Sequence, residues 1–230
     1  MKCRVCGRET ADGPLWVRSL GVCRGKCSAI QLYRMKPEWY LVNTHIPNIF
    51  AEASIDDTIG QYALAHGVCI TGKIGPHGGL LIGDLGTGKS FVAAQLLLLH
   101  IFRGECIEPS VTGEIENLGA GWTEADGYAQ ALRHCQIAER EALVVKNRNI
   151  RALVLDDLGS EYIHEDARIE LETILKHRYH AQHWTIVTMN GTFEDLERDR
   201  PRLASRFAAL GVMRFTGPDL RLADKQEKTK

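Results

Sequence analysis

Residues 80–90 read L-L-I-G-D-L-G-T-G-K-S, and this stretch decides the fold of the chain. Its apolar start, residues 80–82, predicts a short buried strand, and the apolar residues from Phe91 onward predict a helix. Between the two, residues 83–90 match the pattern G-x4-G-K-[ST], directly after a strand and directly before a helix. That pattern in that context predicts a phosphate-binding loop.

The predicted loop consists of Gly83, Asp84, Leu85, Gly86, Thr87, Gly88, Lys89 and Ser90. Glycines allow backbone N–H groups to curl around a phosphate, and the following helix adds the positive end of its dipole. We expect Lys89 to bridge the β and γ phosphates of ATP and Ser90 to hold Mg²⁺. The alternative is a glycine-rich turn without a ligand, which the flanking strand and helix disfavour.

Two aspartates end the next strongly apolar strand. Residues 151–158 read R-A-L-V-L-D-D-L, which resembles a Walker B element. The carboxyl ends of parallel strands form the edge where ligands bind in open α/β sheets. We expect Asp156 to hold magnesium through a water and Asp157 to polarise the water that attacks ATP. Alternatively, the two aspartates only cap the next helix.

Asn190 ends the apolar strand T-I-V-T-M at residues 185–189. An amide there can contact the attacking water or the γ-phosphate without adding charge to an anionic site. A strand-end asparagine is also a common turn residue. Its position in the chain after the acidic strand favours a role in the site.

Arg206 lies in R-L-A-S-R-F, on a short helix predicted to open at Asp199 and Pro201 and to close at Gly211. Leu203 and Phe207 supply its buried face, so a guanidinium on the other face is free to reach a neighbouring subunit. There it would stabilise charge on a γ-phosphate, as arginine fingers do. The alternative is a solvated surface arginine.

The remaining strands and helices alternate along the chain, which predicts an α/β fold with a parallel sheet. We expect strands at residues 152–155, 185–189 and 212–215, a weak one near 119–122, and a helix at 55–66. Thr123 with Asp126 predicts a capped helix start. Residues 45–222 would form the ATPase core, and residues 223–230 a disordered charged tail.

Four cysteines, Cys3, Cys6, Cys23 and Cys27, form a C-x2-C and a C-x3-C pair near the N-terminus. Such pairs can converge on one tetrahedral Zn²⁺, and a reducing compartment offers no disulfide alternative. We therefore predict a zinc-binding module and linker over residues 1–44, against the alternative of four unconnected thiols. Basic residues outnumber acidic ones here, so DNA or an acidic protein face could dock on the module.

The chain has 28 basic and 29 acidic residues and a formal net charge of -1, so any contact with DNA must be regional. Its longest apolar run, residues 91–102, is broken by Gln95 and His100 and is too short to cross a bilayer. We expect no membrane span, no secretory signal and a cytoplasmic location.

Several stretches together resemble the DnaC/IstB-like group of AAA+ ATPases, which includes replicative helicase loaders. The stretches are I-P-N-I-F-A-E-A-S at 46–54, G-D-L-G-T-G-K-S, L-V-L-D-D-L-G-S-E, H-R-Y with T-I-V-T-M-N, R-L-A-S-R-F and F-T-G-P-D-L-R. The resemblance covers residues 45–222. It implies a P-loop core with strand order 5-1-4-3-2, Asn190 as first sensor, Arg206 as finger acting in trans and Arg221 as second sensor.

The resemblance also implies a function: loading or remodelling a replicative helicase on single-stranded DNA, with ATP hydrolysis and self-association through the AAA+ cores. The N-terminal module would grip the helicase. Three alternatives remain: an IstB-type transposase helper, a P-loop small-molecule kinase, and a nucleotide-binding adaptor that hydrolyses little ATP. The sequence departs from the family's usual pattern at Met189, where serine is frequent, and at Asp84 and Leu85, where prolines are frequent.

Overall fold

The computed structural model describes residues 37–50, 59–102, 108–109, 115–117, 119–159 and 165–222. The four cysteines of the predicted zinc module and the tail at 223–230 lie outside the described residues. The helices are α3 (Pro37–Thr44), η1 (Asn48–Phe50), α4 (Ile59–His66), α5 (Lys89–Phe102), α6 (Ala125–His134), α7 (Ile137–Asn149), α8 (Glu165–His180), α9 (Phe193–Asp199) and α10 (Pro201–Leu210).

The strands are β1 (Cys69–Ile74), β2 (Gly78–Gly83), β3 (Glu108–Pro109), β4 (Ile115–Asn117), β5 (Ala120–Glu124), β6 (Ala152–Leu158), β7 (Trp184–Asn190) and β8 (Gly211–Thr216). Within the described part of the chain, six of them form one sheet in the order β1-β8-β2-β7-β6-β5. The strands from β8 to β5 run parallel, and β1 pairs antiparallel with β8 at the edge.

Numbered from β2 along the chain, the parallel strands β2, β5, β6, β7 and β8 lie in the order 5-1-4-3-2. The order implied by the family resemblance is therefore confirmed. Strands β2, β6 and β7 are buried on both faces, which explains why they read as continuous apolar runs. Because of this order, β2 and β7 are neighbours and β6 follows next.

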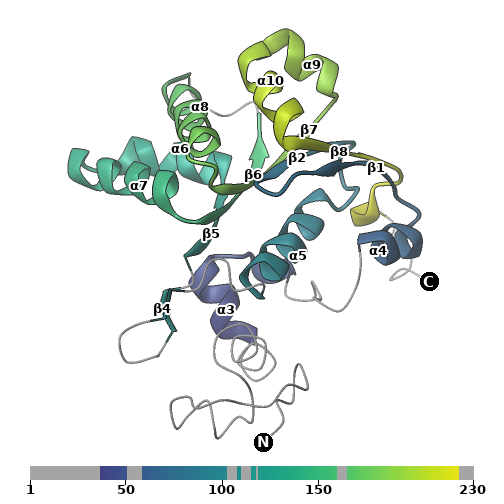
Figure 1. The fold of residues 1–230 in the computed structure, drawn as a ribbon, viewed down its shortest axis with the longest axis horizontal. Coiled ribbons are helices and arrows are strands. Elements are labelled where there is room, and N and C mark those ends of the chain that lie inside the picture. The colour runs from purple at the N-terminus through teal and green to yellow at the C-terminus, as the bar shows by residue number, and fades with distance from the viewer. Residues whose placement is uncertain are drawn as a thin grey trace, which may run out of the picture.

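Helices cover both faces of the sheet (Figure 1). Helix α5 packs below it, in an apolar cluster that also contains Leu41 and Ile46. Helices α6 to α10 cover the other face, where Leu171, Ile174 and Phe207 belong to a second cluster. The result is a three-layer α/β fold whose carboxyl strand ends are left for the site.

Helix α10 begins at Pro201 and is followed by Gly211, as the sequence predicted, but Asp199 is the last residue of α9 and does not open α10. Pro201 occupies the first turn, where its missing N–H has no intrahelical acceptor to lose. Gly211 follows the helix with a φ of 118°, and a Cβ there would lie 2.5 Å from the carbonyl oxygen of Lys73. Only glycine fits this close approach of β1 and β8.

The predicted helix start at Thr123 is wrong. Thr123 belongs to β5, and its hydroxyl donates to Asn147 Oδ1 across 3.0 Å. Helix α6 begins at Ala125, and its N-cap Glu124 makes no side-chain bond to the helix. The Thr123 hydroxyl is therefore bonded to the Asn147 side chain on α7 and does not cap α6.

The proposed domain boundary near residue 45 stays a prediction. Helix α3 precedes it, yet Leu41 of α3 is buried in the same apolar cluster as Ile46. The predicted helix at 55–66 is described only from Ile59, and it ends at His66 before Gly67, as expected. None of the helices in the described residues is long and apolar enough to span a membrane.

Candidate nucleotide-binding site

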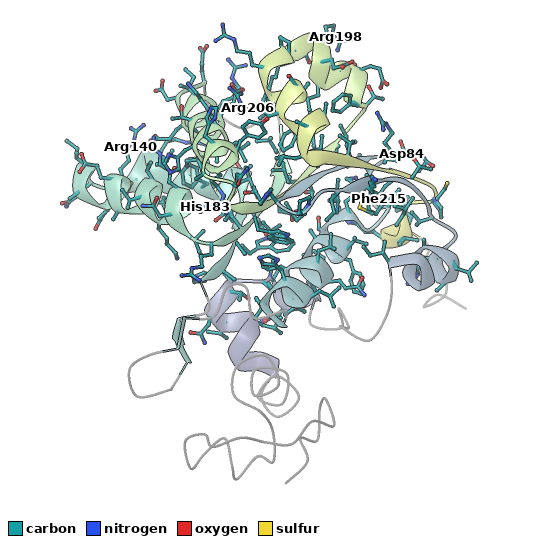
Figure 2. All side chains as sticks on the ribbon, in the orientation of Figure 1. Asp84, Arg140, His183, Arg198, Arg206 and Phe215 are labelled. Carbon is teal, nitrogen blue, oxygen red and sulfur yellow. The ribbon has the colours of Figure 1, made fainter. Side chains whose placement is uncertain are left out.

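The loop at residues 83–90 connects β2 to α5 at the carboxyl edge of the sheet. Gly86 and Gly88 have φ angles of 70° and 84°, a region that favours glycine. The hydroxyl of Thr87 donates to Asp84 O across 2.9 Å and closes the turn. Asp84 N donates to Phe215 O across 3.2 Å, which ties the loop to β8 (Figure 2).

Lys89 is the first residue of α5, at the end of this loop, and 6% of its surface is exposed. Its ammonium donates to Gly83 O at 3.1 Å and to Asp84 O at 2.5 Å. Burial lowers the pKa of Lys89, and the charges of Asp157 and Asp84 oppose that shift. A buried ammonium held by main-chain carbonyls is an available partner for an anion entering the loop.

Asp156 connects the loop to β6. Ser90 Oγ donates to Asp156 Oδ1 across 2.8 Å, although the two residues are far apart in sequence. Thr188 Oγ1 donates to the same oxygen from β7. Burial raises the pKa of Asp156, and the bonds from Thr188 and Ser90 act against that shift.

Asp157 adopts a different backbone conformation from the rest of β6. Its φ is 60°, at the point where the pairing of β6 with β7 shifts register after Leu155. Asp157 N donates to Thr188 Oγ1 across 2.9 Å, and Asn190 Nδ2 donates to Asp157 Oδ1 across 2.9 Å. The irregularity lets consecutive aspartates face two different partners.

These bonds bear on the alternative that Asp156 and Asp157 only cap the next helix. The carboxylates of Asp156 and Asp157 receive hydroxyl and amide donors from the loop and β7. The next described helix, α8, begins only at Glu165. In the described part of the chain these carboxylates therefore bond to the loop and to β7, and Asn190 donates to Asp157 from the end of β7.

The segment after β8 also reaches the loop. Leu220 N donates to Gly86 O across 3.0 Å, and Arg221 N donates to Asp219 Oδ1 across 3.0 Å. A Cβ at Gly86 would lie 1.9 Å from Asp219 Oδ1. The positive charge of Arg221 contributes to the lowered pKa of Lys89, so Arg221 lies on this side of the molecule.

Arg206 lies elsewhere. It lines a hollow of about 360 Å³ with His77, which precedes β2, and Thr185, the second residue of β7. Thr185 and Asn190 are separated by five residue rises, or roughly 17 Å of strand. Figure 2 places Arg206 on the α8 side of α10 and Asp84 on the opposite side. Within the described residues, Arg206 Nη1 donates to Arg202 O on its own helix at 3.1 Å.

The donors in the loop fit a magnesium nucleotide. Hydroxyl and carboxylate oxygens, here from Ser90 and Asp156, are the ligands that Mg²⁺ prefers. The loop offers positive-φ glycines, a helix N-terminus and the Lys89 ammonium to phosphate oxygens. Among the described residues, no group of three or more His, Cys, Asp or Glu side chains is arranged to hold a metal by itself.

Two residues of the site were missed in the sequence. Thr188 joins both aspartates to β7, and Asp219 packs against Gly86. Threonine is common inside apolar strands, so the sequence around Thr188 did not mark it as a site residue. The only usable hint for Asp219 was its place in the stretch F-T-G-P-D-L-R.

No protein-family model and no curated protein sequence matches the chain. The crystal structure of the DnaC helicase loader is similar at 19% identity and a TM-score of 0.52, over 74% of this chain and 100% of that one. This chain has the AAA+ P-loop fold. The likeness to DnaC and the strand order confirm the family resemblance at the level of the fold.

Two further structures also match part of this chain. AMPPCP-bound DnaA from Aquifex aeolicus matches at 21% identity and a TM-score of 0.48, over 68% of this chain and 45% of that one. DnaI matches at 19% identity and a TM-score of 0.44, over 63% of this chain and 77% of that one. The aligned region spans less than half the length of the DnaA chain.

Proposed function

We propose that the protein binds and hydrolyses ATP with magnesium. One observation supports this most strongly: Ser90 of the loop and Asp156 of β6 share a 2.8 Å hydrogen bond. This bond joins the two residue types that hold Mg²⁺ in ATPases of this fold. When bound, the ion would neutralise charge on the β and γ phosphates. The chain's own residues would bind the phosphates and accept the proton from the attacking water.

Lys89 would bind the phosphates by leaving the carbonyls of Gly83 and Asp84. The exposed carboxylate of Asp157 would accept a proton from the attacking water, with Asn190 fixing its Oδ1. Arg206 lies too far from its own loop to take part there. It would act on the γ-phosphate of a neighbouring subunit, and Arg221 would contact the nucleotide of its own subunit.

We further propose that ATP drives the loading of a replicative helicase on single-stranded DNA. The fold-level likeness to a helicase loader and the motif resemblance support this. The N-terminal module at residues 1–44, holding Zn²⁺ through its four cysteines, would grip the helicase. Because the net charge is near zero, single-stranded DNA would contact only part of the surface.

Two other functions use a similar core. An IstB-type transposase helper shares the resemblance, but the zinc module gives the loader a means of gripping a partner. A small-molecule kinase needs arginines closing over the phosphates. Here Arg206 lies near the opposite ends of the strands, which disfavours a kinase.

The deciding experiment is co-purification of the full chain with the host's replicative helicase, with and without ATP, followed by an ATPase assay with single-stranded DNA. We expect ATP-dependent capture and release of phosphate without a phosphorylated second product. Cys6→Ser should release zinc and abolish capture while leaving ATP affinity unchanged. Capture of a transposase instead of the helicase would support the IstB-type function.

A further inference from the structure

Strand β7 sends two polar side chains, Thr188 and Asn190, to the end of β6. They are two residues apart, so they lie on the same face of the strand. Asn190 was expected in the site from its place at the strand end. Thr188 was not, although it contacts both Asp156 and Asp157.

Thr188 is 1% exposed and uses its hydroxyl in both directions. The hydroxyl donates to Asp156 Oδ1 and accepts from Asp157 N at 2.9 Å. The preceding residues of the strand, Ile186 and Val187, are fully buried and apolar. A valine would fill the same space, so packing alone does not explain a hydroxyl here.

The hydrogen bond from the Thr188 hydroxyl to Asp156 helps to fix the orientation of the Asp156 carboxylate. Ser90 and Thr188 both donate to Oδ1, one from the phosphate loop and one from β7. Two donors on one oxygen orient the carboxylate and favour its charged form despite burial. Without Thr188, only Ser90 would remain, and Ser90 is also the residue expected to bind magnesium.

The hydrogen bond from Asp157 N to the Thr188 hydroxyl determines where the Asp157 carboxylate points. Asp157 has a φ of 60°, which is uncommon for a residue other than glycine. Its N–H bond to Thr188 stabilises this conformation, and in this conformation its carboxylate meets the Asn190 amide. A single buried hydroxyl therefore sets the geometry of both acidic residues.

We propose that Thr188 is a positioning residue for ATP hydrolysis, whose hydroxyl holds Asp156 for the magnesium nucleotide and Asp157 for the attacking water. This rests on the proposed ATPase function. Through Thr188 and Asn190, β7 is hydrogen-bonded to both Asp156 and Asp157. A shift of β7 would therefore move the partners of both carboxylates together.

The test compares Thr188→Val, which removes the hydroxyl at nearly constant volume, with Thr188→Ser, which keeps it. We expect Thr188→Val to lower kcat by about 100-fold and to raise KM for Mg·ATP, because the hydroxyl holds both acidic residues. Thr188→Ser should recover activity to within about 3-fold of the wild type. Full activity in Thr188→Val, or equal loss in both variants, would overturn the proposal.

A second readout does not depend on turnover. Fluorescent ADP binding is measured with Mg²⁺ and with EDTA, and Thr188→Val should lose the gain in affinity that Mg²⁺ provides while keeping the affinity in EDTA. An unchanged Mg²⁺ gain would contradict the role of Thr188 at Asp156. If the wild type binds Mg·ADP but hydrolyses no ATP, hydrolysis fails as a function, and this binding comparison still decides the Asp156 half of the proposal.

Thr185→Val is the matched control. Thr185 lies on the same strand with 4% exposure, and its hydroxyl bonds to Arg178 and His183 O, away from the acids. It should lower thermal stability without changing the Mg²⁺ dependence of binding. If Thr188→Val does not fold, Thr188→Ser and Thr188→Ala differ by the hydroxyl alone and allow the same comparison.

Discussion

Asn190 donates a 2.9 Å hydrogen bond to the carboxylate of Asp157, and the two residues come from neighbouring strands at the same edge of the sheet. Asp157 is exposed, and the bond fixes one of its carboxylate oxygens. A carboxylate fixed in this way is suited to accept a proton from water. The first prediction therefore concerns this pair.

Asp157→Asn should suppress hydrolysis and spare nucleotide binding. Asparagine tolerates the φ of 60° at this position, so the backbone should be retained. We expect kcat to fall by at least about 100-fold, since a general base is lost, with ATP affinity changed by less than about 3-fold. Single-turnover hydrolysis and equilibrium binding measure the two effects. A variant with normal turnover would remove Asp157 from the mechanism.

Gly86→Ala should weaken nucleotide binding. The new Cβ would lie 1.9 Å from Asp219 Oδ1, and the φ of 70° is strained for alanine. We expect ATP affinity to fall by about 10-fold or more, which corresponds to roughly 1.4 kcal/mol. Isothermal titration of the variant with Mg·ATP measures it.

Two further variants identify the cause. Gly127→Ala, on the exposed face of α6, has only Glu124 Cβ nearby at 3.9 Å, and it should stabilise the protein by about 0.5–1 kcal/mol. Adding Asp219→Ala to Gly86→Ala should recover part of the lost affinity if the contact matters. No recovery would attribute the whole effect to backbone strain.

Much of the site could be predicted from the sequence because its parts are local. The phosphate loop and the apolar strands β2, β6 and β7 are each contiguous, so their order along the chain already predicts a parallel sheet. Asp156, Asp157 and Asn190 end two of these strands. Strand ends on one edge of a sheet meet in space, and these three do.

The parts that were missed depend on contacts between distant residues. Strand β1 is mostly exposed, so its sequence shows no apolar alternation that would predict a strand. Its Gly72 has a φ of 80° and packs closely against Val212. Helix α7 has a largely polar sequence, and no apolar pattern in it predicted a helix. Thr188 became a site residue only because β6 and β7 are neighbours, which its own strand does not encode.

Arg178→Met should be strongly destabilising. Arg178 is fully buried, and its guanidinium donates to the carbonyls of Asn147, Ile150 and Trp184 and to the hydroxyl of Thr185. The change leaves these acceptors unpaired, so we expect a loss of about 3 kcal/mol or more in the free energy of unfolding. Urea denaturation measures the loss.

Arg168→Ala is the control for Arg178. Its exposed pair with Glu165 spans 3.4 Å on α8, and surface pairs of this kind contribute about 0.5 kcal/mol or less. Equal losses in the two variants would mean that the buried bonds add nothing beyond a surface pair.

ATP affinity should fall at alkaline pH. Phosphate binding requires the charged form of Lys89, and burial lowers the pKa of that group from its ordinary value. Affinity should stay constant below the folded pKa and then fall by about 10-fold for each further pH unit, starting earlier than for an ordinary lysine. Binding measured from pH 7 upward tests this. Lys89→Arg, which keeps its charge, should show no such fall.

Arg206 should act on the site of a neighbouring subunit. Its position beside Thr185, at the far end of β7 from Asn190, excludes it from its own loop. Arg206→Ala and Asp157→Asn should therefore each be inactive alone, because one lacks the finger and the other the base.

Mixing these two variants tests the trans arrangement directly. In a head-to-tail assembly, an Arg206→Ala subunit keeps an intact loop and can receive the finger of an Asp157→Asn neighbour. Roughly a quarter of randomly mixed interfaces would then be complete, so the mixture should regain a comparable share of wild-type ATPase activity. A mixture no more active than the sum of its parts would show that the two residues never meet at one nucleotide.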